Sequence, residues 1–411
     1  MLAVAAALPA CVIIGRTQMP DASSPATLTH DDIRERVRDL ADRLLRPAAA
    51  EIDRTEEYPF GHAKALRDLG IAGMTMPKAY GGRDVDFLGV AIAVEEAAKA
   101  CGISGRIVVD TNMGAVPAIM AYGTEAQKRR AAELILDGDK PAICFSEPEA
   151  GSDATGMKTR AVRRGDRYVL NGTKHWITGA GITRLYLVLA HVYDGEAYQG
   201  IGSFMIESGQ KGLRIGRRLP AMGLRGIPEG FVHLEDCEVP AGALLVPPLG
   251  LKKGFGQIMQ AYNSQRIGAA AVALGIAQGA YEESLSYVDA RQQFGRPVSE
   301  FQGVQWMLAD MAIALRASRL LIHDTARSAN PWPDVTASAQ AKVFTAEAAI
   351  RVTNDALQLH GAAGYGRELP LERMARDARM FTIGGGTTQI LRNMIAGGIL
   401  GRRLPQTRTA R

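Results

Sequence analysis

The sequence predicts an α+β protein of three parts, in which an N-terminal all-α domain precedes a middle β-domain and a C-terminal four-helix bundle. Three observations support this prediction. Residues 31–142 carry amphipathic helical periodicity, short alternating runs follow Pro141, and long alanine-rich helical patterns return from about Gly254. We therefore place an N-terminal extension, expected to be disordered, at 1–28, the all-α domain at 29–141, the β-domain at 142–248 and the bundle at 249–411.

Composition and charge exclude several classes of protein. The 411 residues are 47% hydrophobic and 22% charged, and part of the net charge of +5 lies in the tail 401–411, so a nucleic-acid partner is not expected. No apolar run approaches the roughly 20 residues that span a bilayer, so no membrane partner is expected. The four cysteines have no C-x-x-C spacing and no H-E-x-x-H occurs, which predicts no metal site and favours a cytoplasmic location.

The N-terminal stretch "MLAVAAALPACVIIGR" resembles the apolar region of a signal peptide. It lacks a basic region in front of the apolar run, and Arg16 follows that run instead. We expect a dispensable extension translated from an upstream start, with Met19 as an alternative start, and secretion as the competing interpretation.

The all-α domain begins with an amphipathic helix at 30–52. Four apolar residues spaced three or four apart predict its buried face: Ile33, Val37, Leu40 and Leu44. Two later helical patterns are predicted to end at Gly102 and Gly138, because glycine commonly terminates a helix.

The β-domain is predicted from short β-rich runs and the turn signals between them. The pairs Asn171-Gly172 and Asp194-Gly195 predict tight turns that separate strands. The segment "GSDATGMKT" at 151–159 comes close to a phosphate-binding Walker loop, but Met157 stands where the lysine is required. No G-x-G-x-x-G follows a strand and opens a helix, so a nucleotide cofactor must be held in another way.

The C-terminal bundle is predicted from three long helical patterns. The first is one continuous helix at 256–293, and the second covers 304–328. The break "NPWPD" at 330–334 precedes the third, at 337–361. Helices of this length suit a four-helix bundle.

Three blocks at 144–178, 290–311 and 356–392 resemble the acyl-CoA dehydrogenase flavoprotein superfamily. The first contains "CFSEPEAGSDATGMKT" and "NGTKHWIT", the second "ARQQFGRPVSEFQG", and the third "ALQLHGAAGYG" and "FTIGGGTTQILR". The resemblance covers roughly residues 30–405 in order. It implies the acyl-CoA dehydrogenase fold, bound FAD, a CoA thioester substrate and a homotetramer, or at least a dimer.

The resemblance also implies which residues hold FAD. Positions that match cofactor contacts in the first and last blocks are Phe145, Ser146, Gly151, Ser152, Trp176, Thr178, Thr387 and Gln389. Ser146 and Thr178 offer hydroxyls to the polar edge of the flavin ring, and Trp176 offers a stacking face, with core packing as its alternative. The adenosine diphosphate half is matched, from the neighbouring subunit, by Arg291, Phe294, Gln302, Gln358 and Gly361. Arg291 is suited to pyrophosphate, and a solvated surface arginine is its alternative.

The family's catalytic carboxylate has no counterpart in this sequence. Family members remove the α-proton of the thioester with a glutamate, and the matching position in the last block is Gly385. A minority place the glutamate before an arginine of the long helix, which here is Arg266, and Gln265 stands in that place. A neutral amide is no general base. Two hypotheses remain: a base recruited from another Asp or Glu, or an enzyme that does not dehydrogenate.

Several segments resemble one subfamily, the 3-sulfinopropionyl-CoA desulfinases, which release sulfite and leave propionyl-CoA. They include "GRIVVDTNMGAV", which contains Arg106, and "AYNSQRIGAAA", which contains Gln265. The resemblance implies Arg106 and Gln265 as catalytic residues, with Arg106 anchoring the sulfinate. It implies substrate contacts by Arg106, Ser152, Asn263 and Arg266. The alternatives are a surface position for Arg106, a conventional acyl-CoA dehydrogenase with a relocated base, and a non-catalytic flavin scaffold.

Overall fold

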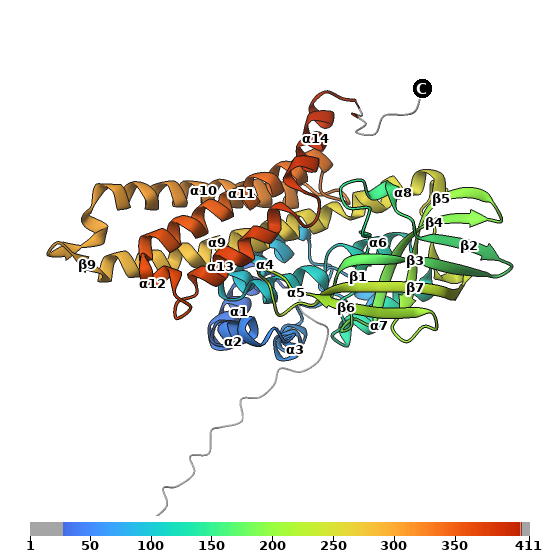
Figure 1. The fold of residues 1–411 in the computed structure, drawn as a ribbon, viewed down its shortest axis with the longest axis horizontal. Coiled ribbons are helices and arrows are strands. Elements are labelled where there is room, and N and C mark those ends of the chain that lie inside the picture. The colour runs from blue at the N-terminus through green and yellow to red at the C-terminus, as the bar shows by residue number, and fades with distance from the viewer. Residues whose placement is uncertain (1–27, 403, 405–411) are drawn as a thin grey trace, which may run out of the picture.

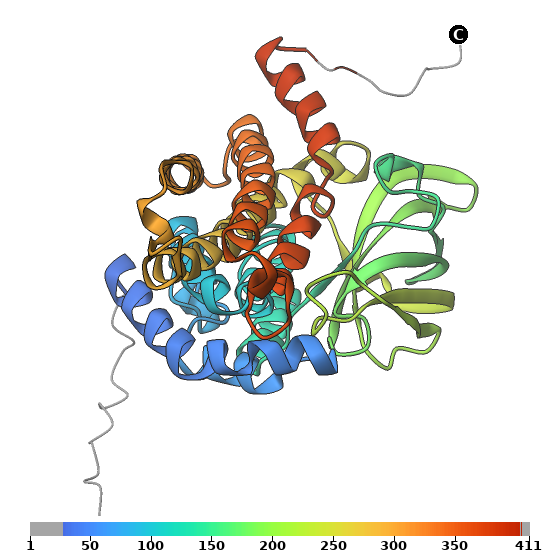
Figure 2. The same cartoon turned by 60° about the vertical axis from the view of Figure 1, so that its left-hand side comes forward.

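The computed structural model describes residues 28–402 and 404, and it has the predicted order of helices, sheet and helices (Figure 1). The predicted fold class is therefore confirmed. The N-terminal extension, apart from Leu28, and the end of the basic tail lie outside the described residues. The helical bundle and the β-domain stand at opposite ends of the long axis, with the N-terminal helices beneath and between them (Figures 1 and 2).

The N-terminal helices differ from the prediction at Gly102, which begins a helix where it was predicted to end one, and in the buried face of the first helix. Ile33, Val37 and Leu40 are buried as predicted, but Leu44 is exposed and Leu45 is buried instead. The cause is a π-helical turn at Ala41–Leu45, which inserts an extra residue and rotates the apolar face by one position. The elements of this part are α1 His30–Leu40, η1 Ala41–Leu45, α2 Arg46–Thr55, α3 Phe60–Asp68, η2 Lys78–Tyr80, α4 Phe87–Ala100, α5 Gly102–Asp110, α6 Ala115–Tyr122 and α7 Glu125–Leu136.

The β-domain is one mixed sheet with the strand order β6-β7-β3-β2-β4-β5-β8, in which β1 pairs in parallel with β4. Its strands are β1 Ala142–Cys144, β2 Arg160–Arg164, β3 Arg167–Thr178, β4 Leu185–Asp194, β5 Ala197–Glu207, β6 Leu213–Leu219, β7 Glu229–Pro240 and β8 Leu244–Leu245, with short 3₁₀ turns η3 Ala154–Gly156 and η4 Ala241–Ala243. The turn predicted at Asp194-Gly195 lies between β4 and β5.

The turn predicted at Asn171-Gly172 is wrong, because both residues lie inside β3. The pairing of β3 with β7 shifts register between Leu170 and Gly172, which marks a β-bulge. The Asn171 side chain donates to Asp236 Oδ1 at 3.1 Å and accepts from the Asp236 backbone N–H at 2.8 Å. These two bonds keep the chain extended across the bulge, so the dipeptide signals irregularity in a strand and not its end.

The bundle also contains one departure from the prediction. The single helix expected at 256–293 is divided at Tyr262 into α8 Gly250–Ala261 and α9 Asn263–Ala290. Because α9 begins directly after Tyr262, Asn263, Gln265 and Arg266 lie in its first turn. The remaining elements are β9 Gln292–Gln293, β10 Arg296–Pro297, η5 Val298–Glu300, α10 Gln302–Arg327, α11 Val335–His360, α12 Ala362–Tyr365, α13 Leu371–Arg379, η6 Met380–Thr382 and α14 Thr388–Ile399.

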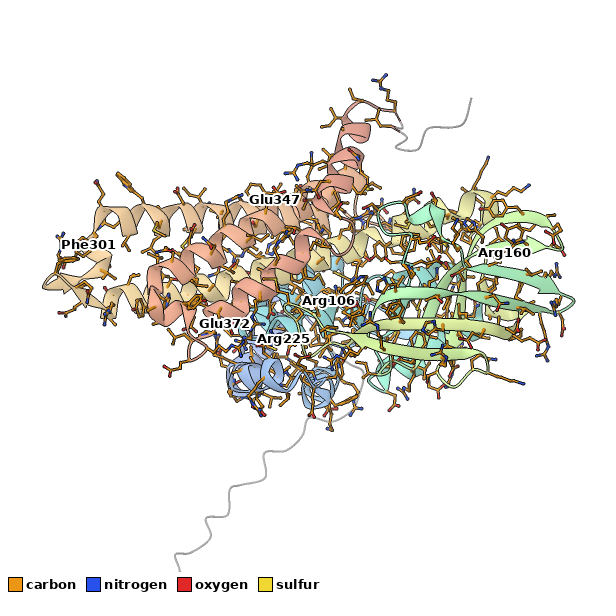
Figure 3. All side chains as sticks on the ribbon, in the orientation of Figure 1. Arg106, Arg160, Arg225, Phe301, Glu347 and Glu372 are labelled. Carbon is orange, nitrogen blue, oxygen red and sulfur yellow. The ribbon has the colours of Figure 1, made fainter. Side chains whose placement is uncertain are left out.

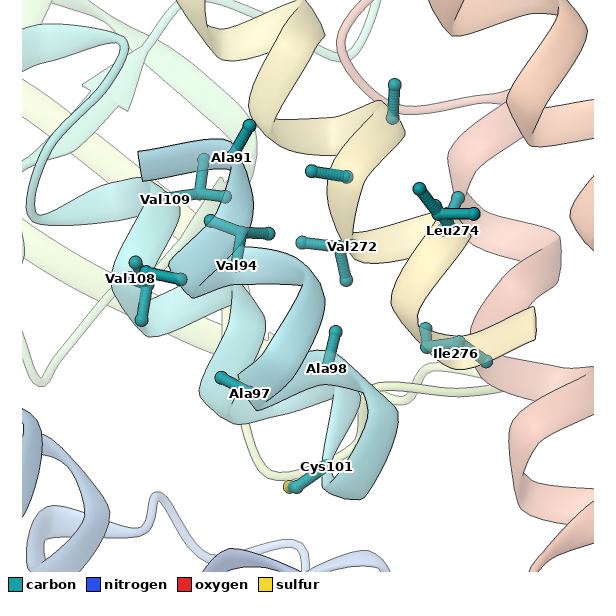
Figure 4. Packing of buried hydrophobic residues seen from close by; sticks show 14 of the residues in the cluster. Ala91, Val94, Ala97, Ala98, Cys101, Val108, Val109, Val272, Leu274 and Ile276 are labelled. Atoms are coloured by element: carbon teal, nitrogen blue, oxygen red, sulfur yellow. The ribbon is translucent and has the colours of Figure 1, made fainter. Parts of the chain in front are cut away.

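The largest core joins the N-terminal helices to the bundle. The helices α4 and α5 pack against α9 through small and branched residues, among them Val94, Ala98 and Val272 (Figure 4). The approach is close: a Cβ at Gly275 would lie 2.6 Å from the Ala98 Cβ and 2.6 Å from the Glu95 carbonyl oxygen. The three helices thus form a rigid platform, and the functional residues of α5 and α9 are carried on it.

Candidate active site

Arg106 lies in the middle of α5, at the junction between the bundle and the β-domain (Figure 3). Only 7% of the residue is exposed. Its Nη2 lies 3.2 Å from Asp110 Oδ1 one turn further along the helix, and its Nε has no hydrogen-bond partner among the described residues. An unused donor on a buried cation is costly, which makes this guanidinium suited to receive an anion. The surface-arginine alternative is excluded by the burial.

Lys140 connects Arg106 and Asp110 to the sheet. Its Nζ lies 3.0 Å from Asp110 Oδ2, although without hydrogen-bond alignment, and donates to the Thr178 carbonyl oxygen at 3.2 Å. Both Lys140 and Asp110 are buried. The pair therefore fixes the end of β3 against α5, which belongs to a different part of the chain.

Glu229 completes this cluster, and the sequence analysis missed it. It stands directly opposite Thr178 in the antiparallel pairing of β3 and β7, and the Thr178 hydroxyl donates to both carboxyl oxygens, at 2.8 and 3.0 Å. Burial raises the pKa of the Glu229 carboxyl to about 7, against the lowering influence of Arg106 and Thr178. Part of its surface remains open. The only signal in the sequence was an acidic residue at the start of a β-rich run.

The first turn of α9 brings the predicted residues Asn263 and Arg266 together. Arg266 Nη1 donates to Asn263 Oδ1, while Arg266 Nε and Asn263 Nδ2 have no hydrogen-bond partners among the described residues. Both side chains are buried, and burial lowers the pKa of the Arg266 guanidinium. Like Arg106, they present unsatisfied polar atoms that a bound polar ligand can use.

Gln265 lies against the junction of α5 and α6. A Cβ at Gly114, whose φ is +72°, would lie 2.7 Å from Gln265 Oε1, so the amide occupies the space that a larger residue at 114 would fill. The Gly114 N–H donates to Ser264 Oγ at 3.3 Å, which fixes the two segments together. Gly114 and Tyr262 also line a small apolar cavity.

The structure brings the two predicted arginines into one electrostatic environment. Burial raises the pKa of the Tyr262 phenol, and the charges of Arg266 and Arg106 both lower it. The small cavity at this phenol is otherwise apolar, with the lining residues Gly114, Ala118, Ile143, Phe145, Leu187, Leu189, Ile258 and Met259. Ser152 is not brought into this group, because it is exposed in the loop between β1 and β2 and no hydrogen bond within residues 28–402 joins it to either arginine.

Four residues predicted to contact the flavin lie in the segment after β1 and near the end of β3. The Ser146 carbonyl accepts from the His175 N–H at 2.8 Å, which places the loop after β1 beside the end of β3. Trp176 has φ of +57° and is 52% exposed, so ordinary core packing is excluded. The ring of Phe145 stacks on that of Phe255, with centroids 6.0 Å apart. Gly151 lies exposed in the loop that also carries Ser152.

The residues predicted to hold adenosine diphosphate lie at the far end of the bundle, near β9 (Figure 1). They are Arg291, Phe294, Gln302, Gln358 and Gly361. Phe294 is 93% exposed, and the Tyr287 hydroxyl donates to the His360 carbonyl oxygen at 3.4 Å, joining α9 to the end of α11. Within one chain, the residues predicted to hold adenosine diphosphate are therefore separated from the residues predicted to contact the flavin.

The glycine loop before α14 is held from α11 and carries no carboxylate. Lys342 Nζ donates to the Gly386 carbonyl oxygen at 2.6 Å, and burial, together with Arg266, lowers the pKa of Lys342 to about 7. Gly385 has φ of +71°, and a Cβ there would meet no atom within 4 Å. Thr387 accepts from the Ile390 N–H at 3.2 Å and caps α14, with Gln389 in the first turn.

Two further properties concern metals and membranes. In the described part of the chain, His, Cys, Asp and Glu side chains nowhere gather in threes in a way that could hold a metal ion. No helix between residues 28 and 402 is both long and apolar enough to cross a bilayer.

A helical domain, a β-domain and a helical bundle that meet at a buried, cation-rich site define an enzyme of the acyl-CoA dehydrogenase type. The chain belongs to the acyl-CoA dehydrogenase family. The family's N-terminal domain model matches residues 27–139, its middle domain model 142–237 and its C-terminal domain model 252–400.

Comparison with individual proteins shows which members of the family the chain resembles. The chain is 55% identical to the 3-sulfinopropanoyl-CoA desulfinase of Variovorax paradoxus, over 92% of this chain and 96% of that protein. It is 54% identical to the protein of the same name from Cupriavidus necator, over 93% and 98%. The structure of butyryl-CoA dehydrogenase from Megasphaera elsdenii superposes with a TM-score of 0.86 at 33% identity, covering 93% and 100%. The predicted resemblance to desulfinases is confirmed.

Proposed function

We propose that the protein is an FAD-containing desulfinase that converts 3-sulfinopropionyl-CoA and water into propionyl-CoA and sulfite. The observation that carries this proposal is the identity of 54–55% with two curated 3-sulfinopropanoyl-CoA desulfinases over nearly the whole chain. The less similar butyryl-CoA dehydrogenase, at 33%, shares the fold.

The buried guanidinium of Arg106 supports an anionic acyl tail. A sulfinate can accept two charge-assisted hydrogen bonds from it, which stabilises the complex by roughly 1.5–3 kcal/mol. An aliphatic tail would leave the Nε, which already lacks a partner, buried and unsatisfied. Arg106 therefore selects against ordinary fatty acyl thioesters.

The residues at the two family base positions support a reaction without oxidation of the acyl chain. Gln265 is a neutral amide and Gly385 has no side chain, so neither can take the α-proton. In the proposed reaction the C–S bond breaks, the carbon gains hydrogen and sulfur gains an oxygen from water. The two changes balance, so no external electron acceptor is consumed. Gln265 orients water or the thioester by hydrogen bonds, while Arg266, Asn263 and Ser152 contact the CoA thioester.

The residues of the β-domain edge fit FAD, the cofactor of this family. Trp176 offers an exposed aromatic face, the Ser146 backbone is hydrogen-bonded to the neighbouring His175, and Thr178 follows two residues after Trp176. Phe145, Gly151, Ser152, Thr387 and Gln389 would complete the flavin contacts. When bound, FAD supplies a flat ring that can exchange electrons with a substrate. The chain's own residues bind it and position the thioester beside it.

The separation of the two predicted cofactor sets supports self-association. Arg291, Phe294, Gln302, Gln358 and Gly361 lie at the end of the bundle far from Trp176 and would serve the FAD of a neighbouring subunit. We infer a homotetramer, or at least a dimer. The three cysteines in the described part of the chain are buried and unpaired, which suits the cytoplasm.

Incubation of the purified holoenzyme with 3-sulfinopropionyl-CoA tests the proposal. We expect stoichiometric free sulfite and propionyl-CoA without an added electron acceptor. The proposal fails if a holoenzyme with full FAD content releases no sulfite.

Glu229 favours a second candidate, α,β-dehydrogenation with a relocated base. A carboxyl with a pKa of about 7 at the site has the properties of a general base. If this is the function, butyryl-CoA bleaches the flavin anaerobically in the wild type and fails to do so in Glu229→Gln. We expect no bleaching in either protein.

A further inference from the structure

Four ionisable side chains, Arg106, Lys140, Asp110 and Glu229, form a linked cluster at the site. Arg106 and Lys140 are cations, and Asp110 lies within 3.2 Å of the first and 3.0 Å of the second. Thr178 connects Lys140 to Glu229, since its carbonyl accepts from Lys140 and its hydroxyl donates to the Glu229 carboxyl. With Glu229 ionised, the cluster is neutral. With Glu229 protonated, it carries one positive charge.

The groups that face Glu229 come from several elements. Arg106 and Asp110 belong to α5, Lys140 precedes β1, and Thr178 ends β3. On the other side β6 places the uncharged Leu219 directly opposite Glu229. Arg218, the residue before Leu219, donates to the Arg225 carbonyl and lies 4.0 Å from Glu56.

Two more basic side chains come from the helices of the bundle. Arg266 of α9 lowers the pKa of the Tyr262 phenol, as Arg106 does. Lys342 of α11, with a pKa of about 7, is held by the Gly386 carbonyl. An anion that binds beside Arg106 therefore meets a four-residue cluster that is neutral when Glu229 is ionised and singly positive when it is protonated, and Lys342 is a second group that titrates near pH 7.

We propose that binding of an anionic acyl tail beside Arg106 is coupled to uptake of one proton by Glu229, which thereby matches the charge of the pocket to its ligand. The inference rests on the proposed function only in assuming that the acyl tail carries a negative charge. Glu229 is in this view a positioning residue, because it acts on the ligand through Arg106 and Thr178.

The physical reason is repulsion between two anions that both interact with the charge of Arg106, which already lowers the pKa of Glu229. A sulfinate or carboxylate next to Arg106 competes with the Glu229 carboxylate for the same positive charge, and this raises the pKa of Glu229 further. In the free protein the Glu229 carboxyl, with a pKa of about 7, is mostly ionised at pH 8. Binding at pH 8 should then take up roughly 0.9 proton, and binding at pH 7 about 0.5. Affinity should weaken as pH rises above 7, approaching tenfold per pH unit.

Titration calorimetry of the holoenzyme with succinyl-CoA tests the coupling. This thioester carries a carboxylate where the substrate carries a sulfinate, and it has no C–S bond in its acyl chain to break. Proton uptake is the slope of the observed binding enthalpy against the ionisation enthalpy of the buffer. Butyryl-CoA, with an uncharged tail of the same length, is the ligand control. Glu229→Gln is the test variant, and Glu196→Gln, on the exposed turn between β4 and β5, is its matched control.

We expect wild type and Glu196→Gln to take up nearly one proton with succinyl-CoA at pH 8 and none with butyryl-CoA. Glu229→Gln should bind succinyl-CoA with no uptake and with a Kd that does not change between pH 7 and pH 9. Uptake that persists in Glu229→Gln would assign the proton to another group, such as Lys342, and overturn the inference. Zero uptake in the wild type, or no binding of succinyl-CoA, would overturn it as well. Because sulfite release is measured separately, loss of the proposed function leaves this result intact, and the reverse also holds.

Discussion

The two ends of α9 carry two different kinds of site. At its start, Arg266 and Asn263 are buried, and the Arg266 guanidinium donates to Asn263 Oδ1. Beyond its end, Arg291 is the exposed C-cap of α9, and Phe294 stands exposed in the turn between β9 and β10. The first site is assembled by packing of the N-terminal helices against the bundle. The second is exposed on a single chain, which is why we propose that a neighbouring subunit completes it.

This difference indicates a division of roles. A buried arginine with an unpaired donor discriminates among acyl tails, because a wrong ligand leaves the charge unsatisfied. An exposed arginine contributes by adding attraction to a cofactor that is held mainly elsewhere, and solvent weakens that contribution. Variants at the two ends should therefore fail in different assays.

Arg106→Ala should have the largest effect. Loss of the bidentate partner is expected to lower kcat/KM for 3-sulfinopropionyl-CoA by about 10-fold to 100-fold, because the lost contact stabilises the complex by roughly 1.5–3 kcal/mol. FAD content, read from the flavin absorbance, should stay unchanged. Arg106→Lys keeps the charge without the planar fork and should still lose most of the activity.

Arg129→Ala, an exposed arginine of α7 that pairs with Glu125, is the matched control. It should retain wild-type activity, since exposed ion pairs contribute little. Wild-type turnover in Arg106→Ala would show that the buried guanidinium does not anchor the acyl tail.

The sequence predicted which residues lie at the buried end of α9, but it did not predict the helix break that precedes them. Arg106, Asn263, Gln265 and Arg266 were identified through family resemblance, and the structure buries all four. Asn263, Gln265 and Arg266 begin α9 because of the break at Tyr262, where an unbroken helix was expected. No local pattern marks that break, because Tyr262 keeps helical dihedrals and the apolar periodicity continues through it.

Glu229 and the π-turn at Ala41–Leu45 escaped prediction for related reasons. The role of Glu229 arises from the strand pairing that sets it against Thr178 and from the burial that raises its pKa, and both are tertiary effects. The π-turn moves burial from Leu44 to Leu45 by inserting one residue, which a fixed helical period cannot represent. Elements whose pattern stays local, such as the break before α11 and the turn at Asp194-Gly195, were predicted correctly.

Arg291→Ala should have the next largest effect, and it should appear in cofactor retention. We expect FAD to dissociate roughly tenfold more readily on dilution, which corresponds to about 1.4 kcal/mol. The preference for a sulfinate tail over an uncharged one should remain as in the wild type. Arg163→Ala, on the exposed face of the β-domain, is the control with unchanged FAD retention. A shift in acyl preference without FAD loss would remove the proposed division of roles.

Gly275→Val should have a smaller effect that is common to both ends of α9. A Cβ at this position would lie 2.6 Å from the Glu95 carbonyl oxygen and from the Ala98 Cβ, so α4 and α9 must separate. Overpacking of this kind costs about 1–3 kcal/mol, and the melting temperature of the holoenzyme should fall by several degrees. Sulfite release and FAD retention should then decline together on warming, because both sites depend on the same platform.

Gly256→Ala in α8, where a Cβ meets no atom within 4 Å, should leave the melting temperature unchanged or slightly raised. If Gly275→Val weakens only one of the two sites, α9 does not act as a single rigid support and the two regions are energetically independent.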